Sequence, residues 1–184
     1  MRNLEALTRD QVNEGNAQIF DALKSKIGKV PNLYATYANS NVALKAILDL
    51  GETLGGGEFS PKEVEAIALS ISEANACDYC LAAHTAIGKM VGFSEGDTVA
   101  LRTNTIANEK LNALVTLAKE ITITRGNPAQ ALVDAFFNAG YSKAALVELI
   151  GFVSVNTFNN YLNHIADTKV DFPAAPALEA VVTA

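Results

Sequence analysis

Apolar residues recur every three or four positions along most of this chain, which is the spacing of helices with one buried face. The clearest run is Leu111, Leu114, Val115, Ala118 and Ile121. No stretch shows sustained alternation of apolar and polar residues, so the pattern predicts no β-sheet. The predicted fold class is therefore all-α, with about seven to eight helices.

Capping residues and glycines divide this pattern into separate predicted helices. The strongest start signal is Ser-Pro-Lys-Glu at residues 60–63, with serine at the cap, proline at the first helical position and glutamate three residues past the cap. We expect that helix to reach about Ala74, and the next to cover residues 77–91 after a weak break at residues 75–76. The other predicted helices cover residues 8–27, 32–54, 94 onwards, 111–125, 127–140 and 142–166, and an extended tail follows at 170–176.

The chain is long enough to form a hydrophobic core without cross-links. A chain of 184 residues buries roughly 70 % of its unfolded surface, so the two cysteines are not needed as a structural disulfide. We predict a single domain over residues 1–184. Its predicted parts are N-terminal helices at 1–58, a helical hairpin at 59–95, C-terminal helices at 96–168 and a tail at 169–184.

Composition narrows the expected partners. Hydrophobic residues make up 49 % of the chain and charged residues only 18 %, so we expect a homo-oligomer that buries apolar surface between its copies. The net charge is −6, and without a basic face we expect no binding to nucleic acid. The first residues hold no signal-peptide core, and no apolar run nears the roughly 20 residues of a membrane helix. We therefore expect no membrane attachment and a cytoplasmic location, where a close cysteine pair is redox-active or metal-binding more often than structural.

Cys77, Cys80 and His84 form the candidate reactive centre. Cysteines three residues apart on a helical turn can close to a disulfide, and the positive end of a helix dipole favours the thiolate. His84 follows Cys80 by one turn and can stabilise thiolate charge or pass a proton. These are the only two cysteines of the chain, and His84 is one of its two histidines.

Other interpretations of the cysteines stay open at this point. With His84 and a fourth ligand such as Glu65 or His164 they could bind zinc, although no second pair of ligands at metal spacing follows. A c-type haem requires histidine directly after the second cysteine, where this chain has Leu81. Free cysteines are also among the most buried residue types, so an inert pair in the core is the structural alternative.

Glu65 is the fourth candidate, and its role depends on the chain folding back. It lies 12 residues before Cys77 and 19 before His84. On one straight helix Glu65 and His84 would be roughly 28 Å apart, whereas in a hairpin that turns at residues 75–76 they lie nearly opposite each other. Without the turn, Glu65 is an exposed helix carboxylate of the common kind. Glu73 is at most a neighbour of the site.

The spacing of these four residues, with eleven positions between Glu65 and Cys77, resembles the signature of the alkylhydroperoxidase AhpD family within the carboxymuconolactone decarboxylase superfamily. The sequence Gly-Lys-Val-Pro-Asn-Leu at residues 28–33 also resembles the longer, peroxidase-related members. The resemblance is firm over residues 28–95 and fades by about residue 168. It implies an AhpD-like all-α fold, assembly into trimers or hexamers, and reduction of organic hydroperoxides by a dithiol.

The resemblance also implies a role for each site residue. Cys80 would attack the peroxide, Cys77 would resolve the intermediate, Glu65 would act as a base through a water, and His84 would belong to the proton relay. The family has a further histidine just before the second cysteine, where this chain has Tyr79, so one proton carrier is missing. The helix dipole favours Cys77 as the nucleophile by typically 0.3–1 kcal/mol. Positioned proton transfer is worth 10²–10⁴-fold and favours Cys80, which is our prediction.

The expected activity is a Cys77/Cys80 dithiol–disulfide cycle that consumes an organic hydroperoxide. A dithiol reductant protein, thioredoxin-like or lipoyl-bearing, would reset it. No flavin, haem or nicotinamide fingerprint is present, so we expect no cofactor and no metal. Two alternatives are a non-enzymatic thiol redox sensor or relay, and the decarboxylase branch of the superfamily, which works without the cysteine pair.

Overall fold

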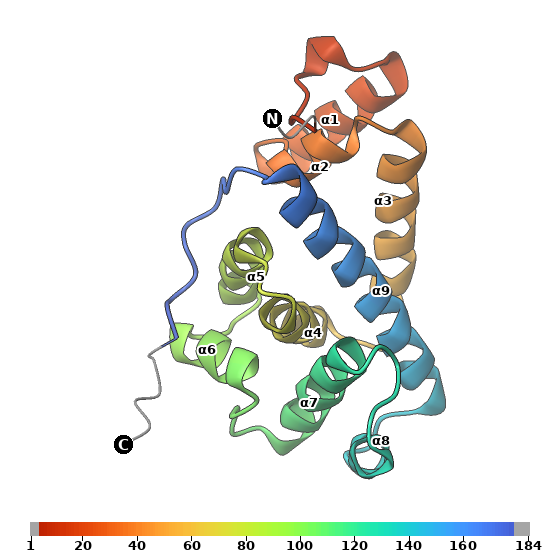
Figure 1. The fold of residues 1–184 in the computed structure, drawn as a ribbon, viewed down its shortest axis with the longest axis vertical. Coiled ribbons are helices and arrows are strands. Elements are labelled where there is room, and N and C mark those ends of the chain that lie inside the picture. The colour runs from red at the N-terminus through yellow and green to blue at the C-terminus, as the bar shows by residue number, and fades with distance from the viewer. Residues whose placement is uncertain (1–3, 179–184) are drawn as a thin grey trace.

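The computed structural model describes residues 4–178, and within that range it contains nine α-helices, one short 3₁₀ turn and no β-strand (Figure 1). The elements are η1 (Arg9–Gln11), α1 (Glu14–Ile27), α2 (Asn32–Tyr37), α3 (Asn41–Gly55), α4 (Pro61–Ala74), α5 (Asp78–Met90), α6 (Glu95–Thr103), α7 (Glu109–Ile123), α8 (Gln130–Asn138) and α9 (Lys143–Ala166). The predicted all-α fold is confirmed. Over the described residues, each helix is either too short or too polar to cross a lipid bilayer.

The central helix of the molecule is α4. It packs against α5, α6, α7 and α9, and Figure 1 shows it almost end-on with these helices around it. Residues 65–72 of α4 are all buried, so the helix is enclosed on every side in its middle. A helix of this kind belongs to a protein core, and side chains on it are held in fixed positions.

The start of α4 follows from local sequence. Ser60 Oγ accepts a hydrogen bond from the Glu63 backbone N–H at 3.3 Å, and Glu63 Oε2 accepts one from the Ser60 N–H at 2.9 Å. Pro61 occupies the first helical position, where its missing N–H costs nothing. The Tyr141 hydroxyl donates to Glu63 Oε1 at 2.9 Å, so the same cap is also tied to the start of the last helix.

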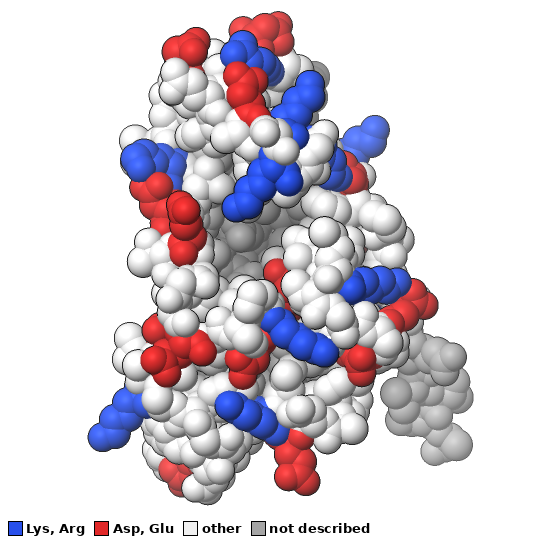
Figure 2. Space-filling view, turned by 180° about the vertical axis from the view of Figure 1, so that it is seen from behind, with Lys and Arg blue, Asp and Glu red and all other residues white. Residues whose placement is uncertain are grey.

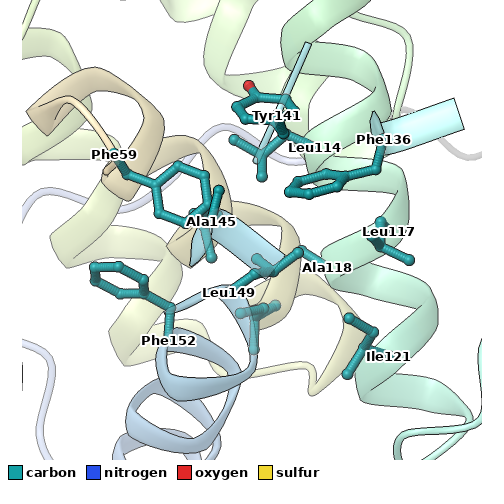
Figure 3. Close-up of a cluster of buried hydrophobic side chains, with 12 residues drawn as sticks. Phe59, Leu114, Leu117, Ala118, Ile121, Phe136, Tyr141, Ala145, Leu149 and Phe152 are labelled. Atoms are coloured by element: carbon teal, nitrogen blue, oxygen red, sulfur yellow. The ribbon is translucent and has the colours of Figure 1, made fainter. Parts of the chain in front are cut away.

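The main hydrophobic core joins α4 to α7, α8 and α9 (Figure 3). Phe136 of α8 is fully buried and stacks on Tyr141 with ring centroids 4.5 Å apart. Phe59, just before α4, packs edge-on against Phe152 of α9 at 5.9 Å. This cluster holds the ends of α4 and α9 together, and no cysteine belongs to it.

A second cluster surrounds the cysteines and comes from the N-terminal helices. Cys77 and Cys80 lie in it together with Phe20 of α1, Tyr37 of α2 and Leu44 of α3. Figure 1 shows α1 and α2 at the C-terminal end of α9, above α5, with α3 running down beside α9. The N-terminal helices therefore form an apolar layer over the start of α5.

The chain after α9 runs back along the molecule without regular structure, past α5 and α6 (Figure 1). This confirms the extended tail predicted at residues 170–176; of the tail predicted over 169–184, residues 179–184 lie outside the described range. Arg102 of α6 donates to the Pro176 carbonyl at 2.6 Å, and Lys29 forms an ion pair with Asp171 at 3.1 Å. The tail is thus attached at two separate points.

Three predicted boundaries were wrong for local reasons. The helix predicted over 32–54 is two helices, because the chain turns at residues 38–40 and Ser40 caps α3 by accepting from the Ala43 N–H at 3.2 Å. The capping box at Thr8 caps only η1, and α1 begins after its own cap at Asn13. Asn127 does not start α8; its side chain donates to the Thr124 carbonyl at 3.2 Å and closes the turn after α7.

Candidate active site

The chain folds back between α4 and α5, as the sequence predicts at residues 75–76. Ala76 adopts a left-handed backbone conformation with φ 52°, which is unusual for a residue with a Cβ and costs about 1–2 kcal/mol. The Cys77 N–H donates to the Ser72 carbonyl at 2.9 Å and closes this turn. The turn replaces one long helix with a hairpin and brings α4 beside α5.

The hairpin places Glu65 of α4 against His84 of α5. Glu65 Oε2 accepts a hydrogen bond from His84 Nδ1 at 2.8 Å, although 19 residues separate them in sequence. Burial alone would lower the pKa of His84, but the charge and hydrogen bond of Glu65 and the charge of Cys77 outweigh it and raise that pKa above its ordinary value. The pair therefore favours the charged form of the imidazole, one turn after the dithiol.

The two cysteines are free, buried and in contact with each other. Cys77 is the N-cap of α5, and its sulfur accepts a hydrogen bond from the Cys80 backbone N–H at 3.4 Å. The hydrogen bond from the Cys80 thiol lowers the pKa of Cys77 to about 7, against the effect of burial, and the Cys80 N–H, His164 and Asn163 lower it further.

The pKa of Cys80 shifts in the opposite direction. Its hydrogen bond to Cys77, its burial and the negative charge on Cys77 all raise the pKa of Cys80, and Asn160 and Asn163 offset only part of this. The two thiols thus share one readily lost proton, and the first negative charge lies on Cys77. In the intact dithiol, the predicted attack by Cys80 therefore begins with transfer of its own proton to Cys77. Without Cys77, the hydrogen bond and the charge that raise the pKa of Cys80 are absent.

Helix α9 adds two side chains that the sequence analysis did not single out. Asn163 Nδ2 lies 3.2 Å from Cys80 Sγ and 3.8 Å from Cys77 Sγ. Asn160 accepts a hydrogen bond from Asn75 Nδ2 at 2.8 Å and also interacts with the Cys80 sulfur. The only signal in the sequence was the spacing of Asn156, Asn160 and Asn163, which puts three amides on one face of a helix.

Tyr79, which replaces the family histidine, is held away from proton transfer. Its hydroxyl donates to Asp171 Oδ1 at 2.8 Å and accepts from the Leu33 N–H at 3.2 Å. Phe172 packs edge-on against the Tyr79 ring with centroids 5.8 Å apart. Burial is the main cause that raises the pKa of Tyr79 well above its ordinary value. Tyr79 therefore links α5 to the tail and to α2.

Of the other residues considered from sequence, Glu73 lies outside this arrangement, and His164 acts on it only through the charge on Cys77. Glu73 forms an ion pair with Arg102 of α6, Oε2 to Nε 2.7 Å. His164 is exposed and its Nε2 contacts the Ala76 carbonyl at 3.2 Å. In the described part of the chain, no three His, Cys, Asp or Glu side chains converge in a way that could hold a metal ion.

The sulfurs lie beneath the surface. Figure 2 shows the face opposite to that of Figure 1, with a hollow in its middle, below the end of the molecule formed by the N-terminal helices. Basic and acidic side chains are interspersed around this hollow (Figure 2). This face presents no large patch of a single charge.

Comparison with known proteins adds a family and a fold. Residues 42–122 match the model of the carboxymuconolactone decarboxylase family. The AhpD-core, peroxidase-related protein of Ralstonia eutropha has a TM-score of 0.82 at 19% identity, covering 90% of each chain. A peroxidase-related protein of Silicibacter sp. has a TM-score of 0.74 at 22% identity, covering 94% of this chain and 92% of that one. The debrominase Bmp8, in complex with 2,3,4-tribromopyrrole, has a TM-score of 0.78 at 19% identity, covering 92% and 91%.

No curated protein sequence matches the chain significantly. The region matched by the family model contains all four predicted site residues, Glu65, Cys77, Cys80 and His84. The solved structures share the arrangement of helices over about nine tenths of the chain. Residues 42–122 of the chain therefore resemble the carboxymuconolactone decarboxylase family, and the fold as a whole is that of AhpD-like proteins.

Proposed function

We propose that this protein reduces organic hydroperoxides with the Cys77–Cys80 dithiol. The observation that carries the proposal is the Glu65–His84 pair, which lies on the same hairpin as two free thiols in mutual contact. One of these thiols has a pKa of about 7, so a thiolate is available at neutral pH. A thiolate beside a positioned acid is what cleavage of an O–O bond requires.

In the first step, Cys80 Sγ attacks the terminal oxygen of the hydroperoxide ROOH while its own proton passes to the Cys77 thiolate. The O–O bond breaks, and Cys80 becomes a sulfenic acid. The departing alkoxide takes the proton of the His84 imidazolium and leaves as the alcohol ROH. Glu65 has held His84 in the charged form until this moment.

In the second step, Cys77 attacks the sulfur of the Cys80 sulfenic acid. Its proton passes through the now neutral His84 to the departing hydroxide, which leaves as water. One hydroperoxide and two thiols thus give one alcohol, one water and one disulfide, and the two electrons come from the sulfurs. Tyr79 takes no part, because Asp171 holds its hydroxyl.

A dithiol reductant protein, thioredoxin-like or lipoyl-bearing, completes the proposed cycle by thiol–disulfide exchange. Such exchange suits the reducing cytoplasm. Because Cys77 and Cys80 are buried, the partner reaches them only after the layer that covers them moves.

The proposed homo-oligomer, a trimer or hexamer, has a suitable surface on α9. Five apolar side chains that are 46 to 70 % exposed follow one face of this helix, namely Val147, Ile150, Phe158, Tyr161 and Ile165. They extend over roughly 27 Å at 1.5 Å per residue. An exposed apolar stripe of this length marks an interaction surface, and we assign it to a second copy of the chain.

Thiol counting tests the proposed reaction. One equivalent of cumene hydroperoxide is expected to remove two thiols per chain and to release one equivalent of the alcohol. Continued consumption in the presence of excess dithiothreitol would show an enzyme, whereas a single round would show a redox sensor. Retention of both thiols would refute the peroxidase, and in that case 2,3,4-tribromopyrrole, the ligand of Bmp8, is the next oxidant to test.

A further inference from the structure

The dithiol carries negative charge in an apolar environment. Besides the cysteines, the cluster that contains them consists of side chains such as Phe20, Leu33 and Ile47. A buried charge is costly unless hydrogen-bond donors replace the lost water. The Cys80 backbone N–H and the Cys80 thiol both donate to Cys77, but the thiol is lost as a donor once its proton moves to Cys77, so a further donor is needed for the charge to persist on either sulfur.

Asn163 is placed to be such a donor. Its side chain is 4 % exposed, and its Nδ2 reaches both sulfurs, Cys80 at 3.2 Å and Cys77 at 3.8 Å. An amide between two sulfurs can follow the charge when the proton passes from one to the other. An asparagine amide keeps its N–H groups at every working pH, so it donates without exchanging protons.

Asn160 supports the same arrangement from one turn earlier on α9. It is fully buried, and its Oδ1 accepts from Asn75 Nδ2 at 2.8 Å. This contact fixes the Asn160 amide, whose Nδ2 is buried and makes no hydrogen bond in the described part of the chain, although the amide is near enough to Cys80 to lower the pKa of that thiol. Asn75 is the C-cap of α4, so the fold-back itself orients Asn160.

We propose that Asn163, assisted by Asn160, is the thiolate-binding group of the dithiol, holding the negative charge on either sulfur during the redox cycle. This rests on the proposed use of Cys77 and Cys80 as the redox centre. Because the thiolate form belongs to the reduced protein, the same amides stabilise the reduced dithiol relative to the disulfide.

Other ionisable side chains also act on the sulfurs. His84 of α5 and His164 of α9 interact with the charge on Cys77. Tyr37 of α2 and Tyr79 of α5 interact with Cys80, but their pKa values are raised far above neutrality, mainly by burial, and they stay uncharged. The two histidines must therefore be followed in the same titration.

The test measures thiolate formation in the reduced protein and uses no peroxide, so it is independent of the proposed activity. The pH dependence of iodoacetamide alkylation gives the first thiol pKa, about 7 in the wild type. Asn163→Leu is expected to raise it by about one pH unit, equivalent to about 1.4 kcal/mol. The control is Asn156→Leu, a buried residue on the same face of α9 whose amide donates to the Phe152 carbonyl at 2.9 Å and not to sulfur.

An unchanged thiol pKa in a folded Asn163→Leu protein would overturn the proposal, as would an equal rise in Asn156→Leu. If the leucine variant does not fold, Asn163→Asp is the second variant, because it keeps the shape of the side chain. It replaces a hydrogen-bond donor with a negative charge and is therefore expected to raise the thiol pKa further. A thiol pKa at or below that of the wild type would refute the proposal. In the wild type, the Asn163 side-chain amide signals in NMR are expected to shift with the same midpoint as the thiol. Signals that stay fixed while the thiolate forms would be equally decisive against it.

Discussion

Replacing Glu65 with glutamine removes the charge that raises the pKa of His84 but keeps the size of the side chain and one acceptor oxygen. Glu65 Oε2 and His84 Nδ1 are 2.8 Å apart, and the two side chains are only 12 % and 21 % exposed. The variant exchanges a charge-assisted hydrogen bond, worth about 1.5–3 kcal/mol, for a neutral one worth about 0.5–1.5 kcal/mol. We expect the free energy of unfolding below pH 6.5 to fall by the difference, about 1–1.5 kcal/mol.

The pH dependence of this loss has a definite sign. The pKa of His84 is raised in the folded protein, chiefly by Glu65 acting against burial. A group with a raised pKa contributes its full stability below its unfolded value, here about 6.5, and loses it as pH rises through the folded pKa. The difference in unfolding free energy between wild type and Glu65→Gln should therefore be largest below pH 6.5 and shrink above it.

Two measurements check this prediction. Urea unfolding at pH 5.5 and pH 8.5 gives the change in stability, and NMR of the imidazole protons gives the His84 pKa, with only two histidines to distinguish. The His84 pKa is expected to fall in Glu65→Gln, and hydroperoxide consumption to slow by 10²–10⁴-fold. The control is Glu73→Gln on the same helix, which breaks the 2.7 Å pair with Arg102 and should leave the His84 pKa in place. An unchanged His84 pKa in folded Glu65→Gln would refute the reasoning.

Three further expectations concern the thiols, the assembly and the core. Cys80→Ser is expected to abolish hydroperoxide consumption, whereas Cys77→Ser should keep one oxidation event and a sulfenic acid that dimedone traps; the opposite pattern would exchange the two roles. Light scattering at micromolar concentration is expected to give a trimer or hexamer of the 19.4 kDa chain, and a monomer would refute the assembly. Phe136→Ala, at a fully buried position, should lower the free energy of unfolding by about 3–5 kcal/mol in urea titrations. A loss below about 1 kcal/mol would contradict the packing of Phe136 in the core.

Features set by local interactions could be predicted from sequence. The start of α4 was predictable because its cap involves only residues 60–63, and the start of α9 because Ser142 caps it by accepting from the Ala145 N–H at 2.9 Å. The position of the fold-back was predictable because Glu65 and His84 can meet within one chain only if the chain turns between them. The break at residues 38–40 was missed because no glycine or proline marks it, and the polar residues Asn39, Ser40 and Asn41 were the only cue.

The asparagines of α9 could not be predicted because burial is a tertiary property. Asn160 and Asn163 sit on a helix whose periodicity is weak, and polar residues there are normally expected to face water. They are buried because the N-terminal layer and the fold-back between α4 and α5 both pack on that part of α9. The contacts that bury them join segments more than 80 residues apart, such as Asn75 with Asn160.

The site draws its two kinds of groups from different parts of the chain. The thiols and the acid pair lie within residues 42–122, which match the family model, whereas Tyr37, Asn160 and Asn163 lie outside that range. The thiols and the acid pair make thiol redox chemistry possible, whereas the side chains from outside the matched range lie near the sulfurs and, in our proposal, stabilise the thiolate. The family match covers the thiols and the acid pair but not the side chains from outside the matched range. It therefore indicates the type of chemistry and does not identify the substrate. For the proposed reaction, we expect the choice of oxidant to depend on α2 and α9, because Tyr37 of α2 and Asn163 of α9 are among the side chains that interact with Cys80.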